Sequence, residues 1–148
     1  MLLDTDILID LLRGKKEARD FLYSLPADSL NYCSAVTVAE IHSGMREAER
    51  QVTTELIESL VVLPVTKDIA ETAGRFMREH RRVAVSKQPM RAGRGIKPGA
   101  ANNQSDTFEP ELDDCLIAAT AAVEGLQLAT RNRRHYPMPE VRVQTASY

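Results

Sequence analysis

The sequence is poor in aromatic residues, cysteines and long apolar runs. It has no tryptophan, and aromatic residues make up 5% of its 148 residues, so base stacking on an aromatic platform is not an evident recognition device. Cys33 and Cys115 stand far apart, unlike the paired cysteines of zinc sites, and we interpret both as reduced core residues, a disulfide being the open alternative. No apolar run approaches the ~20 residues that a membrane helix needs.

An excess of charge is also lacking. The chain has 19 Lys and Arg against 21 Asp and Glu, a net charge of -2, so a polyanion such as nucleic acid must be attracted locally. The amino terminus has no basic region before its apolar residues, which argues against a signal peptide. With 43% hydrophobic residues, we expect one soluble cytoplasmic domain over residues 1–148, without membrane association.

Short apolar runs alternate with helical patterns along the chain. Strands are predicted at residues 2–3, 30–35, 61–65, 126–130 and 141–143, and helices at 7–12, 16–25, from 37, 53–60, 66–82 and 112–124. This alternation predicts an α/β fold of three layers, α/β/α, with a mostly parallel central sheet. Such sheets bind ligands beyond the carboxyl ends of their strands.

Periodicity disappears between residues 86 and 110. Proline, glycine, asparagine and serine accumulate there among basic residues, which is typical of a long loop. We therefore expect a flexible basic loop inserted within the domain at 86–110.

Acidic side chains follow the predicted strands. Asp4 comes directly after the first strand, Glu40 lies in the first turn of the helix after the second, and Asp114 begins the helix before the fourth. Asn132 follows that fourth strand. Carboxylates gathered at one edge repel one another unless they are protonated or a cation neutralises them. Oxygen ligands without cysteine or an obvious histidine favour Mg²⁺ or Mn²⁺ over zinc.

Each of these acids also has a purely structural interpretation. Thr37 and Glu40 match a capping box, and acids at positions 113 and 114 suit the positive end of a helix. Asp6 can likewise cap a helix. Asp4 is harder to explain in this way, because an acid directly after a buried strand needs a partner that offsets its desolvation.

Four segments in order resemble a known family. They are LLDTDILID (2–10), SAVTVAE (34–40), DCLIAATA (114–121) and LATRNRRHY (128–136). Together they look like a PIN-domain ribonuclease of the VapC type, the toxin of a toxin–antitoxin pair. The resemblance covers nearly the whole chain except 86–110.

The resemblance implies a metal-dependent ribonuclease. Carboxylates matching Asp4, Glu40 and Asp114 bind Mg²⁺ or Mn²⁺ in that family and are needed to hydrolyse RNA, with Glu40 or Asp114 as a further candidate for proton acceptor. A fourth acid is common at the position of Asn132, so this chain departs from the pattern there, and metal affinity is expected to be weaker. Asp6 either restores that charge or caps the helix. A VapB-like antitoxin and a homodimer are further implications.

A basic group follows the site and is expected to hold RNA phosphates. Our candidates for RNA contact are Arg131, Arg133, Arg134, Thr5 and Thr37. Both threonines have an alternative role as turn and cap residues.

Two rival functions remain at this point. Asp4 and Asp6 after a strand also resemble the nucleophile motif of haloacid-dehalogenase-like phosphatases, although the later motifs of that family are not recognisable. Alternatively, the loss of charge at Asn132 would leave a non-catalytic PIN-like binding module.

Overall fold

The computed structural model describes residues 1–26, 29–86 and 110–148. Most of the predicted loop at 86–110 therefore lies outside the described residues. The elements in chain order are β1 (Leu2–Leu3), α1 (Thr5–Leu12), α2 (Lys16–Ser24), β2 (Tyr32–Ser34), α3 (Ala35–Gly44), the short 3₁₀ helix η1 (Glu47–Glu49), α4 (Arg50–Glu58), β3 (Val61–Leu63), α5 (Lys67–Ser86), α6 (Leu112–Val123), β4 (Leu128–Thr130), the 3₁₀ helix η2 (Arg133–His135) and β5 (Val143–Thr145).

The strands form one sheet in the order β3-β2-β1-β4-β5. Each of these neighbouring pairs is parallel. The chain moves outward from β1 to β2 and β3, and then crosses back to β4 on the other side of β1. This reversal creates a crevice at the carboxyl ends of β1 and β4, where ligands bind in open α/β sheets. The predicted α/β fold with a parallel central sheet is confirmed.

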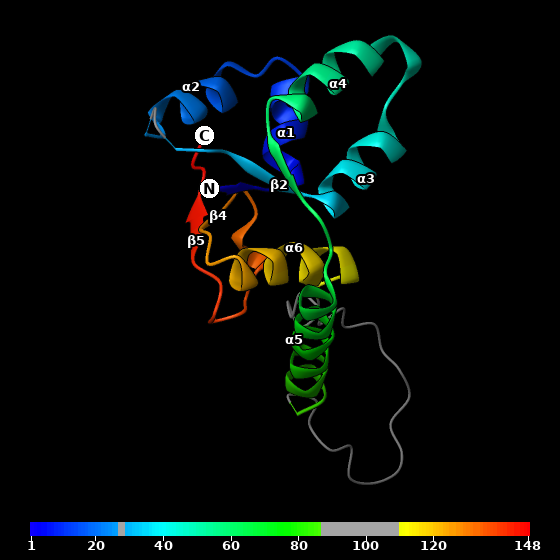
Figure 1. Cartoon of the computed structure of the whole chain (residues 1–148). Coiled ribbons are helices and arrows are strands. Elements are labelled where there is room, and N and C mark those ends of the chain that lie inside the picture. The colour runs from blue at the N-terminus through cyan, green and yellow to red at the C-terminus, as the bar shows by residue number, and fades with distance from the viewer. Residues whose placement is uncertain (27–28, 87–109) are drawn as a thin grey trace, which may run out of the picture.

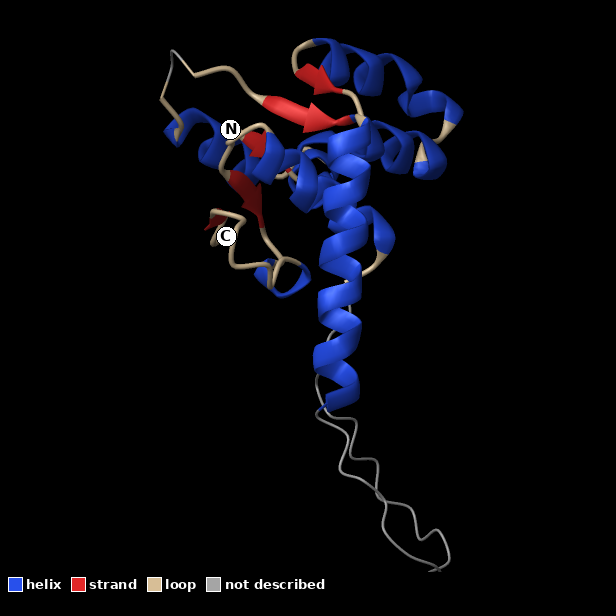
Figure 2. Ribbon diagram, turned by 60° about the horizontal axis from the view of Figure 1, so that its bottom comes forward, coloured by secondary structure: helices blue, strands red, loops and turns tan. Residues whose placement is uncertain are grey.

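Helices cover both faces of the sheet, which gives the three predicted layers. Leu2 and Leu3 are both fully buried but belong to different cores, because successive strand residues point to opposite faces. Leu2 packs with Phe76 of α5 and with α6, whereas Leu3 packs with α1 and with Ile41 of α3. Figure 1 shows α1 to α4 on one side of the sheet and α5 and α6 on the other. The long helix α5 projects beyond the layers (Figure 2).

Two helices end at glycines in the left-handed conformation. Gly14 after α1 has φ 70° and Gly125 after α6 has φ 64°. An L side chain is strained at such φ values, whereas glycine adopts them freely. Glycine is therefore the residue suited to end both helices.

Some element bounds differ from the expectation. The helix α4 begins at Arg50 rather than at Thr53, because η1 runs directly into it and no threonine cap is needed. Thr53 is instead buried inside that helix. The strand expected at 30–35 is shorter, since the chain enters α3 at Ala35, capped by Ser34 rather than Thr37.

Both cysteines are core residues, as expected. Cys33 and Cys115 are free and buried, and desolvation raises the pKa of each thiol to about 11. They are core residues, and the alternative of a disulfide is not observed. No helix in the described ranges is long and apolar enough to cross a membrane.

Phe76 provides a test of the core beneath α5. It is fully buried in the described structure, so Phe76→Ala should lower the free energy of unfolding by about 3–5 kcal/mol through lost burial and a cavity. Tyr23, which is 84% exposed, offers the control: Tyr23→Ala should change stability by no more than about 0.5 kcal/mol. Urea denaturation measures both, and equal effects of the two variants would contradict this packing.

Candidate active site

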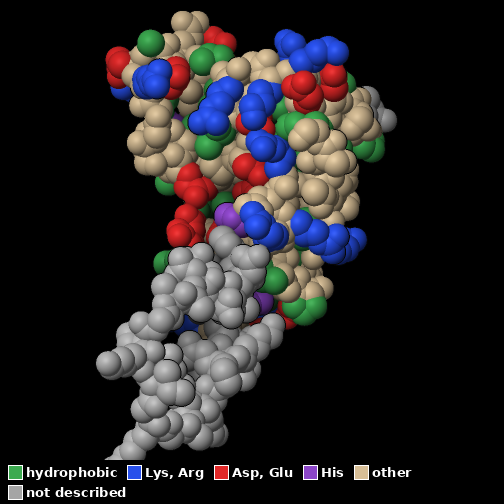
Figure 3. All heavy atoms as spheres, turned by 180° about the vertical axis from the view of Figure 1, so that it is seen from behind, with side chains coloured by type: hydrophobic (Ala, Val, Ile, Leu, Met, Phe, Trp, Pro, Cys, Tyr) green, Lys and Arg blue, Asp and Glu red, His purple; other side chains and the backbone are tan. Residues whose placement is uncertain are grey.

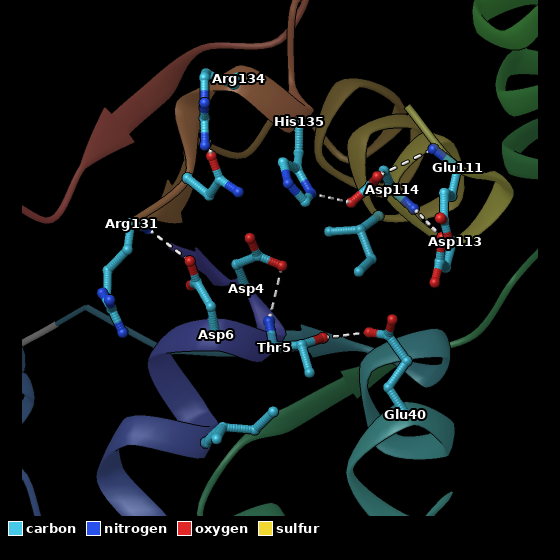
Figure 4. A pocket seen from close by; sticks show the side chains of 13 residues that line it. Asp4, Thr5, Asp6, Glu40, Glu111, Asp113, Asp114, Arg131, Arg134 and His135 are labelled. Atoms are coloured by element: carbon cyan, nitrogen blue, oxygen red, sulfur yellow. Dashed lines mark hydrogen bonds and ion pairs between the residues drawn. The ribbon is translucent and has the colours of Figure 1, made fainter. Parts of the chain in front are cut away.

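A cavity of about 680 Å³ opens at the carboxyl ends of β1 and β4. Side chains from α1, α3, α6 and the segment after β4 point into it (Figure 4). Its lining residues are Asp4, Thr5, Asp6, Ile9, Glu40, Glu111, Asp113, Asp114, Ile117, Arg131, Asn132, Arg134 and His135. The four residues predicted for the site, Asp4, Glu40, Asp114 and Asn132, are thus brought together.

Asp4 follows β1 directly and is the N-cap of α1. Its Oδ1 accepts hydrogen bonds from the backbone N–H of Thr5 at 2.8 Å and from the hydroxyl of Tyr136 at 2.7 Å. The residue is only 6% exposed, and this desolvation, with the nearby charge of Asp6, raises the pKa of Asp4 to about 6. Both hydrogen bonds end on Oδ1, and a further hydrogen bond from the hydroxyl of Thr130 does not outweigh the desolvation.

Glu40 reaches the cavity from the second turn of α3, not from the first as expected. Because Ser34 caps this helix, the capping-box interpretation of Thr37 and Glu40 is wrong. Glu40 accepts a short hydrogen bond from the hydroxyl of Thr5, which lies 3.2 Å from the hydroxyl of Thr37. Desolvation and the neighbouring acids raise the pKa of Glu40 well above its ordinary value. Glu40 is therefore a site residue by position.

Asp114 serves the helix and the cavity at once. Its Oδ2 accepts a hydrogen bond from the backbone N–H of Glu111 at 3.0 Å, which caps α6. Its Oδ1 lies 3.0 Å from Nδ1 of His135 and lines the cavity. The capping interpretation of this acid was therefore correct but incomplete, because a carboxylate has two oxygens.

Asp6 joins α1 to the segment that follows β4. Its Oδ2 accepts hydrogen bonds from the backbone N–H of Arg131 at 3.0 Å and from the hydroxyl of Thr130 at 3.3 Å. Its Oδ1 is buried and has no hydrogen-bond partner among the described residues. Burial raises the pKa of Asp6, as expected for a carboxylate whose charge is poorly compensated. Asp6 does not cap α1, since Asp4 holds that position.

The cavity is suited by its chemistry to a hard divalent cation. Among the described lining residues, six carboxylates face two arginines and a histidine. Oxygen donors and an excess of negative charge are what Mg²⁺ and Mn²⁺ require, and the orphaned Oδ1 of Asp6 is an acceptor in need of a partner. In the described part of the chain no three potential ligands already enclose an ion, so side chains would have to turn inward to hold one.

A sequence profile places this site in a known family. The profile of the PIN domain matches residues 1–141. The chain belongs to the PIN domain family. Ribonuclease VapC10 of Mycobacterium tuberculosis is 41% identical to this PIN domain over 140 residues, which are 95% of this chain and 88% of the relative. Ribonuclease VapC19 of the same organism is 33% identical over 138 residues, 93% of this chain and 92% of the relative.

This PIN domain also superposes on solved structures over nearly its whole length. A toxin–antitoxin complex from Klebsiella pneumoniae matches with a TM-score of 0.70 and 26% identity, covering 99% of this chain and 97% of that one. A DNA-bound VapBC from Salmonella typhimurium matches with a TM-score of 0.70, 20% identity and the same coverage, which shows the fold alone. The predicted PIN-like fold is confirmed.

The residues predicted to contact RNA differ in whether they line the cavity of the PIN domain, lie exposed beside it or are buried. Thr5, Arg131 and Arg134 line the cavity, whereas Arg133 is exposed beside it. Thr37 is completely buried, so a direct contact with RNA was a wrong expectation for this residue. Its hydroxyl instead accepts a hydrogen bond from the hydroxyl of Thr5 at 3.2 Å, and Ser34 is the N-cap of the helix.

Three neighbours of the carboxylates were missed by sequence reasoning. Asp113 lines the cavity and raises the pKa of Glu40, and its position next to Asp114 was a usable signal. His135 was not among the predicted site residues, yet its Nδ1 lies 3.0 Å from Oδ1 of Asp114. Tyr136 gave no signal, since it lies 132 positions from Asp4 and meets it only through the strand order.

The raised pKa of Asp4 predicts that its charge destabilises the metal-free protein. Asp4→Asn keeps an oxygen for both hydrogen bonds, so at pH 8 in EDTA it should stabilise the fold by about 1–3 kcal/mol, the energy of a shift of roughly two pKa units. Because the folded pKa of about 6 exceeds the ordinary 3.8, the penalty is absent below 3.8, grows as the pH rises toward 6 and is complete above it.

Urea denaturation between pH 4 and 8 measures this difference. Asp20→Asn, at an exposed aspartate of α2 outside the cavity lining, is the control and should show no comparable gain. An Asp4→Asn variant that is no more stable than the wild type at pH 8 would contradict the predicted destabilisation of the fold by the charge of Asp4.

Proposed function

We propose that this PIN-domain protein is a ribonuclease toxin that hydrolyses RNA phosphodiester bonds with Mg²⁺ or Mn²⁺ held by Asp4, Glu40 and Asp114. The observation that carries this proposal is the convergence of these carboxylates on one cavity, in a chain 41% identical to ribonuclease VapC10 over 95% of its length. A VapB-like antitoxin is its proposed inhibitor. Cytoplasmic location and a homodimer remain predictions.

A divalent cation in this cavity would polarise the scissile phosphate, stabilise developing negative charge and lower the pKa of water. Asp4 is suited to hold it, because hydrogen bonds from Thr5 and Tyr136 fix the orientation of its carboxylate at the cavity. Asp114 is anchored in the same way, through the backbone N–H of Glu111. Asp6 adds an uncompensated oxygen close to the position where Asn132 lacks a charge.

Glu40 is the proposed proton acceptor. Its raised pKa brings it toward neutrality, where a general base works best, and the hydroxyl of Thr5 orients it. Water would attack phosphorus, its proton would pass to Glu40, and the bond from phosphorus to the leaving oxygen would break. The leaving oxygen then takes up a proton, which completes hydrolysis.

RNA and antitoxin are the proposed partners. On the face seen in Figure 3, acidic side chains lie in the middle with basic side chains and a histidine close to them. Arg131 and Arg134 line the cavity and Arg133 is exposed nearby, so all three remain candidates for phosphate contacts. The structural relative from Klebsiella pneumoniae is a toxin–antitoxin complex, which supports a VapB-like antitoxin as the inhibitor.

The rival functions are not favoured. A phosphatase of the haloacid-dehalogenase type would use Asp4 as a covalent nucleophile, but the relatives named above are ribonucleases. A purely binding PIN-like module would not need an excess of anionic side chains over cationic ones in one cavity. Hydrolysis of p-nitrophenyl phosphate is therefore expected to be absent.

Cleavage of a mixed-sequence RNA pool tests the proposal. The purified toxin should cleave it with Mg²⁺ or Mn²⁺ and lose cleavage in EDTA. Asp4→Asn and Glu40→Gln should each lower the rate by roughly a hundredfold or more, because each removes a negative ligand or the proton acceptor. Asp20→Asn should retain activity. Cleavage that persists in EDTA, or in Asp4→Asn, is incompatible with the proposed mechanism.

Metal affinity tests the roles of Asn132 and Asp6 separately. Asn132→Asp adds a carboxylate to the cavity and should bind Mn²⁺ several-fold more tightly, whereas Asp6→Asn should weaken binding by roughly tenfold, since hard-cation affinity follows the number of charged ligands. Isothermal titration calorimetry measures both, with Asp20→Asn as the control. An unchanged affinity in Asp6→Asn would show that this residue only holds the segment after β4.

A further inference from the structure

A buried carboxylate lies one helical turn beyond Asp6 on α1. Asp10 is 1% exposed, and its Oδ1 lies 2.7 Å from Nζ of Lys15. Its Oδ2 accepts a short hydrogen bond from the guanidinium of Arg131, far along the chain. Asp6 and Asp10 are four residues apart and so share a face of α1. Together these two acids attach the segment after β4 to α1.

Arg131 is held at both its main chain and its side chain. Its backbone N–H donates to Asp6 at 3.0 Å, and its guanidinium binds Asp10 and lies 5.6 Å from the ring centroid of Tyr148. The side chain is nevertheless 37% exposed and lines the cavity. A guanidinium carries five N–H donors, and the bond to Asp10 uses the nitrogen Nη1 alone.

Asp10 alone does not cancel the charge of Arg131, because it is shared with Lys15. Although burial opposes it, hydrogen bonds from Lys15 and Arg131 lower the pKa of Asp10, so its carboxylate stays ionised. Asp10 therefore meets two cations, Lys15 and Arg131, and its single charge cannot neutralise both, although the charge of Asp6 also acts on Arg131. Since burying an ion pair costs about as much desolvation energy as it returns, the pair is better explained by orientation than by stability.

We propose that Asp10 is a positioning residue of the nuclease site, which holds Arg131 so that its free N–H groups meet an RNA phosphate at the edge of the acidic cavity. The inference rests on the proposed ribonuclease function and deepens it. An acidic cavity repels phosphate, so a cation fixed at its rim is needed to bring RNA close to Asp4 and Glu40. A fixed guanidinium loses less conformational entropy on binding than a free one.

The substitutions are Arg131→Ala, Arg131→Lys and Asp10→Asn, and the double variant Asp10→Asn with Arg131→Ala. Arg50 and Glu47 supply matched controls, because they form a similar pair, at 2.7 Å, on an exposed surface outside the cavity lining. The probe is a fluorophore-labelled, quenched single-stranded RNA of mixed sequence. The readouts are kcat, KM and the salt dependence of kcat/KM, with thermal unfolding measured alongside.

Arg131→Ala should raise KM roughly tenfold with little change in kcat, as expected for one lost charged hydrogen bond. Its plot of log kcat/KM against log salt should be shallower by about 0.7, the contribution of one phosphate contact. Arg131→Lys should behave similarly, since an ammonium cannot bind Asp10 and phosphate as a rigid fork. Asp10→Asn should raise KM in the same direction, and the double variant should match Arg131→Ala. Arg50→Ala and Glu47→Gln should resemble the wild type.

Three results would overturn the inference. They are a wild-type KM in Arg131→Lys, a wild-type KM in folded Asp10→Asn, and additive effects in the double variant, which would show that Asp10 acts independently of Arg131. If Asp10→Asn fails to fold, Arg131→Lys decides, because it retains both charges. A wild-type protein that does not cleave RNA, by contrast, would refute the proposed function itself.

Discussion

Like charges crowd at the carboxyl edge of this sheet, and the surrounding contacts respond to that crowding. Asp4 emerges from a buried strand, Glu40 approaches from α3 and Asp114 from α6. Two like charges 4 Å apart repel by about 4 kcal/mol at an effective dielectric constant of 20. Hydrogen bonds from Tyr136 and Thr5 stabilise the charged carboxylates, yet the pKa values of Asp4 and Glu40 stay raised, first through desolvation and then through neighbouring acids. A divalent cation would supply the positive charge that these carboxylates still need.

The same acids that build the candidate site also hold the fold. Asp4 caps α1 and Asp114 caps α6, each with one oxygen, and both carboxylates also line the cavity. Stability and chemistry therefore share residues, because parallel strands bring helix N-termini to the edge where ligands bind. Capping and catalysis, which compete as explanations for a single residue in the sequence, are compatible in three dimensions.

Binding RNA demands positive charge that the net charge of -2 does not supply. In the structure, positive charge is placed at the edge of the acidic cavity rather than supplied by an overall excess of basic residues. Asp10, which also pairs with Lys15, holds the guanidinium of Arg131 at the edge of the cavity, while other acids line the cavity itself. This geometry keeps an attractive charge within reach of a phosphate without neutralising the carboxylates that would hold a cation.

The sequence by itself determined the parallel α/β fold, the strand that ends at Asp4 and the segments that contribute Glu40, Asp114 and Asn132. Hydrophobic periodicity and position after a strand are local signals, so they are readable along the chain. Only the tertiary structure decided that Thr37 is buried, that Tyr136 donates to Asp4 and that Arg131 binds Asp10. The two hydrogen bonds join residues 132 and 121 positions apart, and the strand order β3-β2-β1-β4-β5 brings them together. No local pattern encodes that order, because it depends on which strands find neighbours across the whole chain.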